Sequence, residues 1–156
     1  MPRILSLLLF LTTLGLVQPA QCAEGPYAVY RSSAQFLDVM RALQMAIEER
    51  GLYVNTIMHM GDMLARTGKD LGMDKPLFLQ AETVQFCSAL LSRRMTEENP
   101  ARIVNCPYLI SVYVLPTEPD VTYIAHRRLD QDDPGPVMDE VEAMLEGLAK
   151  AAAEGF

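Results

Sequence analysis

The chain has no tryptophan, two histidines and three cysteines among its 156 residues. It contains no Gly-x-Ser-x-Gly, His-Glu-x-x-His or Cys-x-x-Cys motif, so nothing points to an α/β-hydrolase, a zinc peptidase, a thioredoxin or a c-type haem site. The stretch "RTGKD" holds the Gly-Lys of a phosphate loop, but Met63 replaces its first glycine and Asp70 its Ser or Thr. We therefore expect a non-catalytic role more than an enzyme.

A long basic stripe is also missing. The sequence has 13 Lys and Arg against 20 Asp and Glu, and adjacent basic residues occur only as Arg93-Arg94 and Arg127-Arg128. Nucleic-acid binding depends largely on neutralising phosphates, and anionic lipid repels an acidic surface. We expect no nucleic-acid partner, and no membrane partner once the N-terminal segment has been removed.

The N-terminal segment has the pattern of a secretory signal. Arg3 precedes an apolar run over residues 4–17, and small residues follow around Cys22. The run is about 14 residues long, short of the roughly 20 that span a bilayer. We predict a signal peptide over residues 1–22, a single domain over residues 23–156 and a periplasmic location. Lipidation at Cys22 and an uncleaved anchor are the alternatives.

Hydrophobic periodicity predicts one α+β domain. Apolar residues at helical spacing indicate a helix over residues 36–50 and another from Val137 onward. Residues 27–32, 52–60, 102–115 and 121–128 read as strands, the last two as a hairpin, with Cys106-Pro107 at the start of the third strand or at an edge. We predict a two-layer sandwich with a mainly antiparallel sheet and helices packed on one face.

Two segments leave questions open. Residues 77–86 fit a strand followed by a helix from Ser88, but a single helix from Ala81 also keeps the apolar spacing. Gly61 is expected to end the strand at 52–60, and Asp62 to cap a short helix that ends at Gly68 or Gly72.

His59 lies between Met58 and Met60, with Met63 close behind. Imidazole and thioether groups suit Cu(I), which makes a copper site one interpretation. Strand alternation weakens it, because Met58 and Met60 would share one face while His59 projects from the other. The simpler interpretation is that the methionines fill gaps in the core and that His59 is a surface or hydrogen-bonded residue. His126, beside two arginines, is interpreted as a solvated strand end rather than a general base.

Cys87 and Cys106 remain together in the mature chain if Cys22 leaves with the signal. In an oxidising compartment the first interpretation is a structural disulfide. Two unpaired buried thiols, or a functional pair that exchanges disulfides or binds metal or haem, are the alternatives. Cys-Pro dipeptides can present a thiolate to haem iron, and Cys106-Pro107 is such a dipeptide.

Three stretches carry a family resemblance: "FLDVMRALQMAIEERGL", "FCSALLSRRMTEENPARIVNCPYLISVYVL" and "VTYIAHRR". They resemble the domain-of-unknown-function 302 family, in an exported proteobacterial branch. The resemblance implies a small α+β domain that is commonly dimeric, with no established reaction, and it favours the strand at 77–86. In typical members the proline precedes the cysteine, whereas Pro107 follows Cys106.

These observations lead to one prediction and two alternatives. The prediction is a periplasmic binding or accessory protein that holds a small ligand, haem or a soft metal such as copper near His59, Cys87 and Cys106. The first alternative is a thiol-disulfide redox protein using Cys87 and Cys106. The second is a structural homodimeric module in which the same cysteines form an inert disulfide.

Overall fold

The computed structural model describes residues 25–131 and 133–155. The predicted signal peptide and Cys22 lie outside the described residues. Within the described part of the chain, no helix is both long and apolar enough to cross a membrane.

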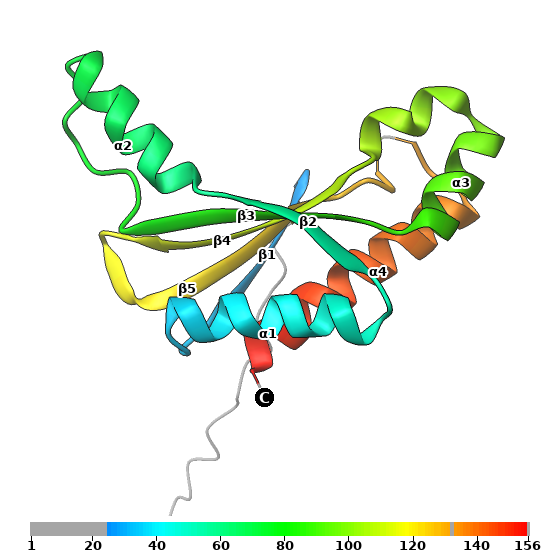
Figure 1. Ribbon diagram of the computed structural model, residues 1–156, viewed down its shortest axis with the longest axis horizontal. Helices are drawn as coiled ribbons and strands as arrows, with labels where there is room; N and C mark the ends of the chain where they lie inside the picture. The colour runs from blue at the N-terminus through cyan, green and yellow to red at the C-terminus, as the bar shows by residue number, and fades with distance from the viewer. Residues whose placement is uncertain (1–24, 132, 156) are drawn as a thin grey trace, which may run out of the picture.

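Five strands form one antiparallel sheet (Figure 1), in the order β1-β5-β4-β3-β2. The strands are β1 (Tyr27–Ser32), β2 (Tyr53–Met58), β3 (Gln80–Cys87), β4 (Tyr108–Leu115) and β5 (Glu118–Arg127). β4 and β5 form the predicted hairpin at the centre of the sheet. Pro107 directly precedes β4, where its missing N–H removes no hydrogen bond from the ladder.

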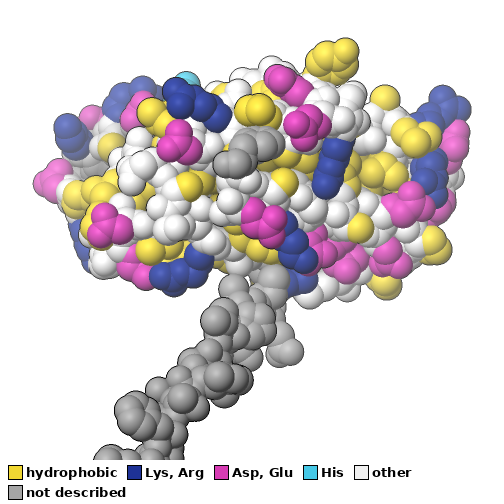
Figure 2. Space-filling model, turned by 90° about the horizontal axis from the view of Figure 1, so that it is seen from below, with side chains coloured by type: hydrophobic (Ala, Val, Ile, Leu, Met, Phe, Trp, Pro, Cys, Tyr) yellow, Lys and Arg dark blue, Asp and Glu magenta, His cyan; other side chains and the backbone are white. Residues whose placement is uncertain are grey.

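Helices α1 (Phe36–Glu49) and α4 (Pro136–Glu154) cover one face of the sheet. The predicted α+β sandwich is confirmed. Both helices bury an apolar stripe against strand residues that alternate toward them; the largest buried side chains include Leu43, Ile47, Phe86, Tyr108, Ile110, Ile124 and Leu148. Each such aliphatic or Phe side chain contributes about 1.5–3 kcal/mol when it leaves water. The outer surface of this layer mixes acidic and basic side chains (Figure 2).

Two further helices lie beyond the ends of the sheet and leave the face opposite α1 and α4 open. α2 (Met60–Asp70) rises beyond one end of the sheet, while α3 (Ala89–Glu98) and the short 3-10 helix η1 (Pro100–Asn105) lie beyond the other (Figure 1). On this open face the ring of Tyr113 stacks on that of Tyr123 at 5.1 Å, and Arg31 lies over Tyr123.

The ambiguous segment is a strand followed by a helix. β3 ends at Cys87, and the Ser88 hydroxyl accepts a hydrogen bond from the Leu91 N–H at 3.3 Å, which caps α3. The alternative of one helix from Ala81 is wrong, because residues 80–87 pair with both β2 and β4.

The predicted short helix is present, but Gly61 does not end the strand, because β2 already stops at Met58. α2 begins at Met60, so Gly61 lies in its first turn and Asp62 is not the cap. A side chain at Gly61 would place Cβ 3.0 Å from the Ala81 backbone nitrogen. The glycine therefore allows α2 to lie close against β3 rather than ending the preceding strand.

Strict alternation along β2 is also wrong. The ladder between β2 and β3 shifts register between Val54 and Thr56, leaving Asn55 as a bulge. Val54 and Ile57 consequently pack against the core, whereas Met58 pairs with Thr83 and shares its side of the sheet. One extra residue in a strand reverses the facing of everything after it.

Candidate functional site

The two cysteines lie side by side where β3 ends and β4 is about to begin. Phe86 pairs with Tyr108 at the end of the β3–β4 ladder; Cys87 is the next residue after Phe86, and Cys106 comes two residues before Tyr108. Their sulfur atoms are 3.0 Å apart, and both thiols are free and half-buried. A disulfide bond is about 2.05 Å long, so this distance is a contact between two thiols. The Cys106-Pro107 peptide bond is cis.

A chain of polar and sulfur atoms leads from Cys106 toward α3. The Ser92 hydroxyl donates to Cys106 Sγ at 3.4 Å and lies 3.5 Å from the Tyr108 hydroxyl oxygen. The Tyr108 hydroxyl donates in turn to Met95 Sδ at 3.7 Å. Since Tyr108 and Met95 are fully buried, these weak contacts satisfy groups that water cannot reach.

Burial raises the pKa of Cys87 to about 11, and the hydrogen bond and charge of Cys106 act in the same direction. The Tyr108 backbone and the bulged Asn55 side chain favour the thiolate, but their effect is smaller. The thiolate is the nucleophile and the metal ligand, so little of the reactive form of Cys87 exists at neutral pH.

His59 does not join the cysteines. Met58 pairs with Thr83 and Tyr53 with Cys87, so His59 and Cys87 lie at opposite ends of the β2–β3 ladder. Thr83 and Cys87 are separated by about 13 Å at roughly 3.3 Å per strand residue. The largely exposed His59 ring places Nδ1 2.9 Å from Glu82 Oε1.

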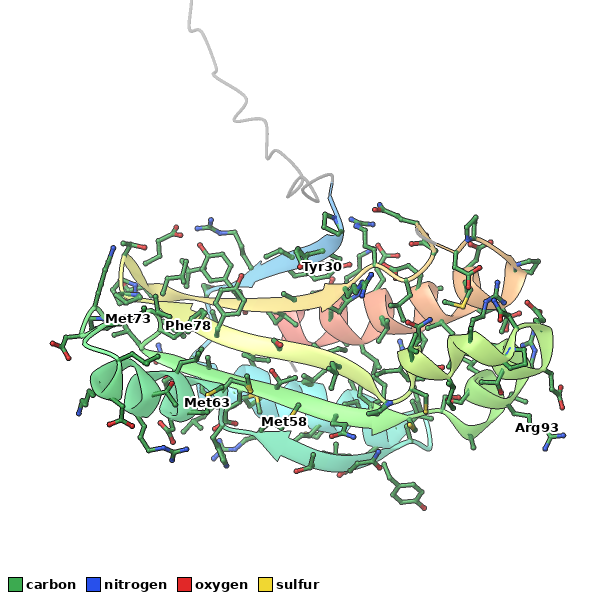
Figure 3. All side chains as sticks on the ribbon, turned by 90° about the horizontal axis from the view of Figure 1, so that it is seen from above. Tyr30, Met58, Met63, Met73, Phe78 and Arg93 are labelled. Atoms are coloured by element: carbon green, nitrogen blue, oxygen red, sulfur yellow. The ribbon has the colours of Figure 1, made fainter. Side chains whose placement is uncertain are left out.

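The described residues contain no group of three His, Cys, Asp or Glu side chains placed to hold a metal ion. Figure 3 shows Met58 and Met63 toward the α2 end of the sheet, away from Arg93 on α3. His59, Cys87 and Cys106 were predicted to share one site. The two cysteines are in contact, whereas the histidine lies far from them.

Sequence reasoning missed a cavity between β4 and β5. The printed pairs of this ladder stop at Ser111 and Ala125, although β4 begins at Tyr108 and β5 continues to Arg127. Where the strands part, a cavity of about 350 Å³ opens, and most of its wall is apolar; the lining includes Tyr27, Pro107, Leu109, Ala125, His126 and Leu129. Pro107 connects this wall directly to Cys106.

His126 is one of the residues around this cavity, but its side chain is fully enclosed. The interpretation of a solvated strand end is wrong, because the His126 side chain is 0 % exposed. Its ring stacks on Tyr30, and Nδ1 lies 3.1 Å from the Arg127 carbonyl oxygen. The sequence did contain a pattern that predicts this burial, because Thr122, Ile124 and His126 alternate on the buried face of β5. The two arginines that follow His126 obscured it.

A second cavity, of about 270 Å³, adjoins the first and shares Val104, Asn105, Arg127 and Leu129 with it. Its outer wall is held by Arg102, whose guanidinium donates to Asp133 at 2.6 Å and to Glu98 at 2.7 Å. This bridge connects η1 to the loop after β5 and thereby fixes the two sides of the groove.

Comparison with known proteins places the chain in a family. The family model described as "Domain of unknown function DUF302" matches residues 28–152. The chain belongs to the DUF302 family. A crystal structure of an uncharacterized conserved DUF302 protein from Bacillus stearothermophilus has a TM-score of 0.67 to this chain, with 16 % sequence identity; the match covers 81 % of this chain and 98 % of that one. At that identity the likeness shows the fold alone. No curated protein matches the sequence significantly.

Proposed function

We propose that this DUF302 protein is a periplasmic, non-catalytic binding protein that holds a small, mainly apolar ligand in the cavity between β4 and β5. The observation that carries the proposal is the parting of β4 and β5, which opens about 350 Å³ of mostly apolar space where β4 begins and β5 ends. Volumes of this order suit small organic ligands. The location rests on the signal-like segment at residues 1–22.

In this proposal Cys87 and Cys106 form a structural disulfide that fixes the cavity wall. Their sulfurs already touch, and Pro107, the next residue, lines the cavity. Oxidation would remove two protons and two electrons from the thiols, to an oxidised dithiol oxidase of the periplasm.

The redox alternative receives less support from the same geometry. A disulfide-exchange protein needs an accessible thiolate, and burial holds the Cys87 pKa near 11. Haem or copper at the cysteines would need that thiolate too, and His59 is too far away to act as a further ligand.

The proposal is tested by NMR titration of the exported protein with 4-propylanisole, an apolar probe of suitable size. We expect amide shifts at Leu109, Ala125 and Leu129, and we expect Ala125→Leu to abolish them by filling the cavity. Val29→Leu is the matched control, because Val29 pairs with Ala125 across the sheet but does not line the cavity. Shifts elsewhere, or shifts that survive Ala125→Leu, would contradict this site.

A second proposal concerns assembly: the protein forms a homodimer through the arm made of α2 and residues 71–79. α2 has no buried residue, and the segment after it exposes Leu71, Met73, Leu77 and Leu79 around a cavity of about 360 Å³. An amphipathic helix with an uncovered apolar side needs a partner, and a second copy brings an equal apolar surface about a twofold axis.

The dimer is tested by light scattering over a range of concentrations. We expect Leu77→Asp to yield a monomer, because two such charges would meet near the twofold axis. Leu90→Asp on α3 is the control, since Leu90 is equally exposed but lies at the other end of the sheet. A monomeric wild-type protein, or a dimer disrupted only by Leu90→Asp, would refute the arm as the interface.

A further inference from the structure

The end of β5 carries an exposed arginine on the open face of the sheet, next to the cavity. Side chains alternate along a strand, so Ala125 and Arg127 project away from α1 and α4, whereas His126 between them is buried on the helix side. Tyr27 pairs with Arg127 across the sheet, and all of these residues line the cavity between β4 and β5. The guanidinium of Arg127 is therefore carried on the solvent side of the cavity.

The charges around the two adjoining cavities have one sign in excess. Of the described residues that line the β4–β5 cavity, Arg127 is the only one with a permanent charge. The second cavity adds Arg102, Arg128 and Asp133, and the Asp133 carboxylate already accepts two hydrogen bonds from Arg102, at 2.6 and 3.0 Å. The whole chain has 20 Asp and Glu against 13 Lys and Arg, so this positive excess is local.

The carboxylates closest to this region are already engaged. Glu142 on α4 accepts from the Leu129 N–H at 3.2 Å and lies 3.8 Å from the His126 ring, which places it on the helix side of β5, opposite to the side chain of Arg127. Glu98 accepts from Arg102 at 2.7 Å. An anion at Arg127 would thus meet a cation without an adjacent lining carboxylate, and salt screens the more distant acidic groups.

We propose that the ligand is an apolar carboxylic acid, bound in its ionised form with its hydrocarbon part between β4 and β5 and its carboxylate at Arg127. This inference rests on the proposed function, because it names the class of ligand that the β4–β5 cavity takes. A guanidinium presents parallel N–H groups that match the two oxygens of a carboxylate. Arg127 and Asn105 line both cavities, so the polar end of the ligand lies where the apolar space meets the second cavity.

The test compares 4-propylbenzoate with 4-propylbenzamide by calorimetric titration of the full exported protein. The two probes have the same shape and differ in charge. At low ionic strength we expect the carboxylate to bind about tenfold more tightly, the order of magnitude of one hydrogen bond to a charged group. Added salt should lower this preference and leave the affinity for the amide unchanged. These measurements use the wild-type protein and do not depend on how a variant folds.

Two variants locate the preference. Arg127→Gln should reduce the affinity ratio to about one while the amide still binds, because the new side chain is polar but uncharged. Arg41→Gln is the control, since it removes the same charge from an exposed position on α1, on the other side of the sheet, and should leave the ratio unchanged.

The outcomes separate this inference from the cavity itself. Equal affinity for the two probes, or a preference for the carboxylate that persists in Arg127→Gln, would overturn the role of Arg127 and leave the cavity proposal intact. Carboxylate binding that survives Ala125→Leu would place the anion outside the cavity and would also overturn the inference. Failure of both probes and of 4-propylanisole to bind would overturn the inference and the cavity proposal together.

Discussion

Cys87 Sγ lies 3.0 Å from Cys106 Sγ, just beyond the end of the β3–β4 ladder, whose last pair is Phe86–Tyr108. The contact joins the end of β3 to the residue before Pro107, which lines the cavity between β4 and β5. The sulfur pair and the cavity are thus parts of one local structure.

Oxidation of the sulfur pair should stabilise the protein. The two cysteines are 19 residues apart, and closing a loop of that length stabilises by about 3 kcal/mol in the chain-entropy model. We expect protein isolated from the periplasm to show no free thiol in denaturant, and its reduced form to have a free energy of unfolding lower by that amount. Chemical denaturation with and without a reductant measures the difference. Two free thiols in freshly isolated, unreduced protein would contradict the disulfide.

In the reduced protein Cys87 should react slowly. A pKa of about 11 in place of 9.0 leaves roughly 100-fold less thiolate at pH 8 than an ordinary cysteine has. Alkylation by iodoacetamide, followed residue by residue with peptide mass spectrometry, should be slow at pH 8 and rise steeply toward pH 11. Alkylation of Cys87 at pH 8 as fast as that of a free cysteine would show an accessible thiolate and favour the redox alternative.

The same shift predicts the alkaline stability of the reduced protein. Above pH 9 the unfolded chain loses the Cys87 proton while the folded protein keeps it until about pH 11. The folded state then binds more protons, so stability falls as pH rises through this window. The Cys87→Ala variant should lack this contribution. Thermal unfolding of both proteins between pH 8 and 11 measures it, and parallel curves would contradict the shift.

Replacing Arg102 should loosen the groove. Its guanidinium, largely shielded from solvent, bridges Asp133 and Glu98 and lowers the pKa of Asp133. The Tm of Arg102→Ala should fall more than that of Arg93→Ala, which removes only an exposed pair with Glu97. The stabilisation that comes from the lowered Asp133 pKa is fully present above the ordinary pKa of an aspartate. It is lost as the pH falls through the lower pKa that Asp133 has in the folded protein. Equal Tm values for the two variants at pH 7 would mean that the ion pairs of Arg102 do not stabilise the fold more than the exposed Arg93 pair does.

Gly61 should resist replacement by alanine. Alanine favours a helix over glycine by about 1 kcal/mol, but its Cβ would meet the Ala81 backbone at 3.0 Å. We expect Gly61→Ala to destabilise the protein by about 1–3 kcal/mol, since backbone must move. Arg66→Ala, an exposed change in the same helix, serves as the control. Denaturant unfolding compares them, and a stabilised Gly61→Ala would show that α2 does not lie so close to β3.

Much of the fold follows from periodicity. Residues 36–49 repeat apolar side chains at helical spacing, so α1 was predicted within two residues of its ends. Alternation from Tyr108 predicted β4, but residues 102–105, which were expected to be part of the same β segment, belong to η1. The roles of Gly61 and Asn55 were not predicted, because both depend on the neighbouring strand β3. Gly61 allows α2 to approach Ala81 closely, and Asn55 is a bulge in the β2–β3 ladder.

The candidate site divides in the same way. The sequence suggested that Cys87 and Cys106 belong together, and they are in contact. The sequence also suggested that His59 lies near the cysteines, which is wrong. A position near the end of a strand does not show at which end of the sheet that residue lies. The cavity could not be seen in the sequence, since it depends on where β4 and β5 stop pairing. His126 followed the alternation of β5, but the charged residues after it pointed to solvent.

Native mass spectrometry of protein gently isolated from the periplasm tests the central claim most directly. A small organic ligand in the β4–β5 cavity predicts an added mass that Ala125→Leu abolishes and that Val29→Leu retains, with 4-propylanisole supplied if the ligand is lost during isolation. An added mass that Ala125→Leu retains, or none in any variant even with 4-propylanisole present, would contradict the account.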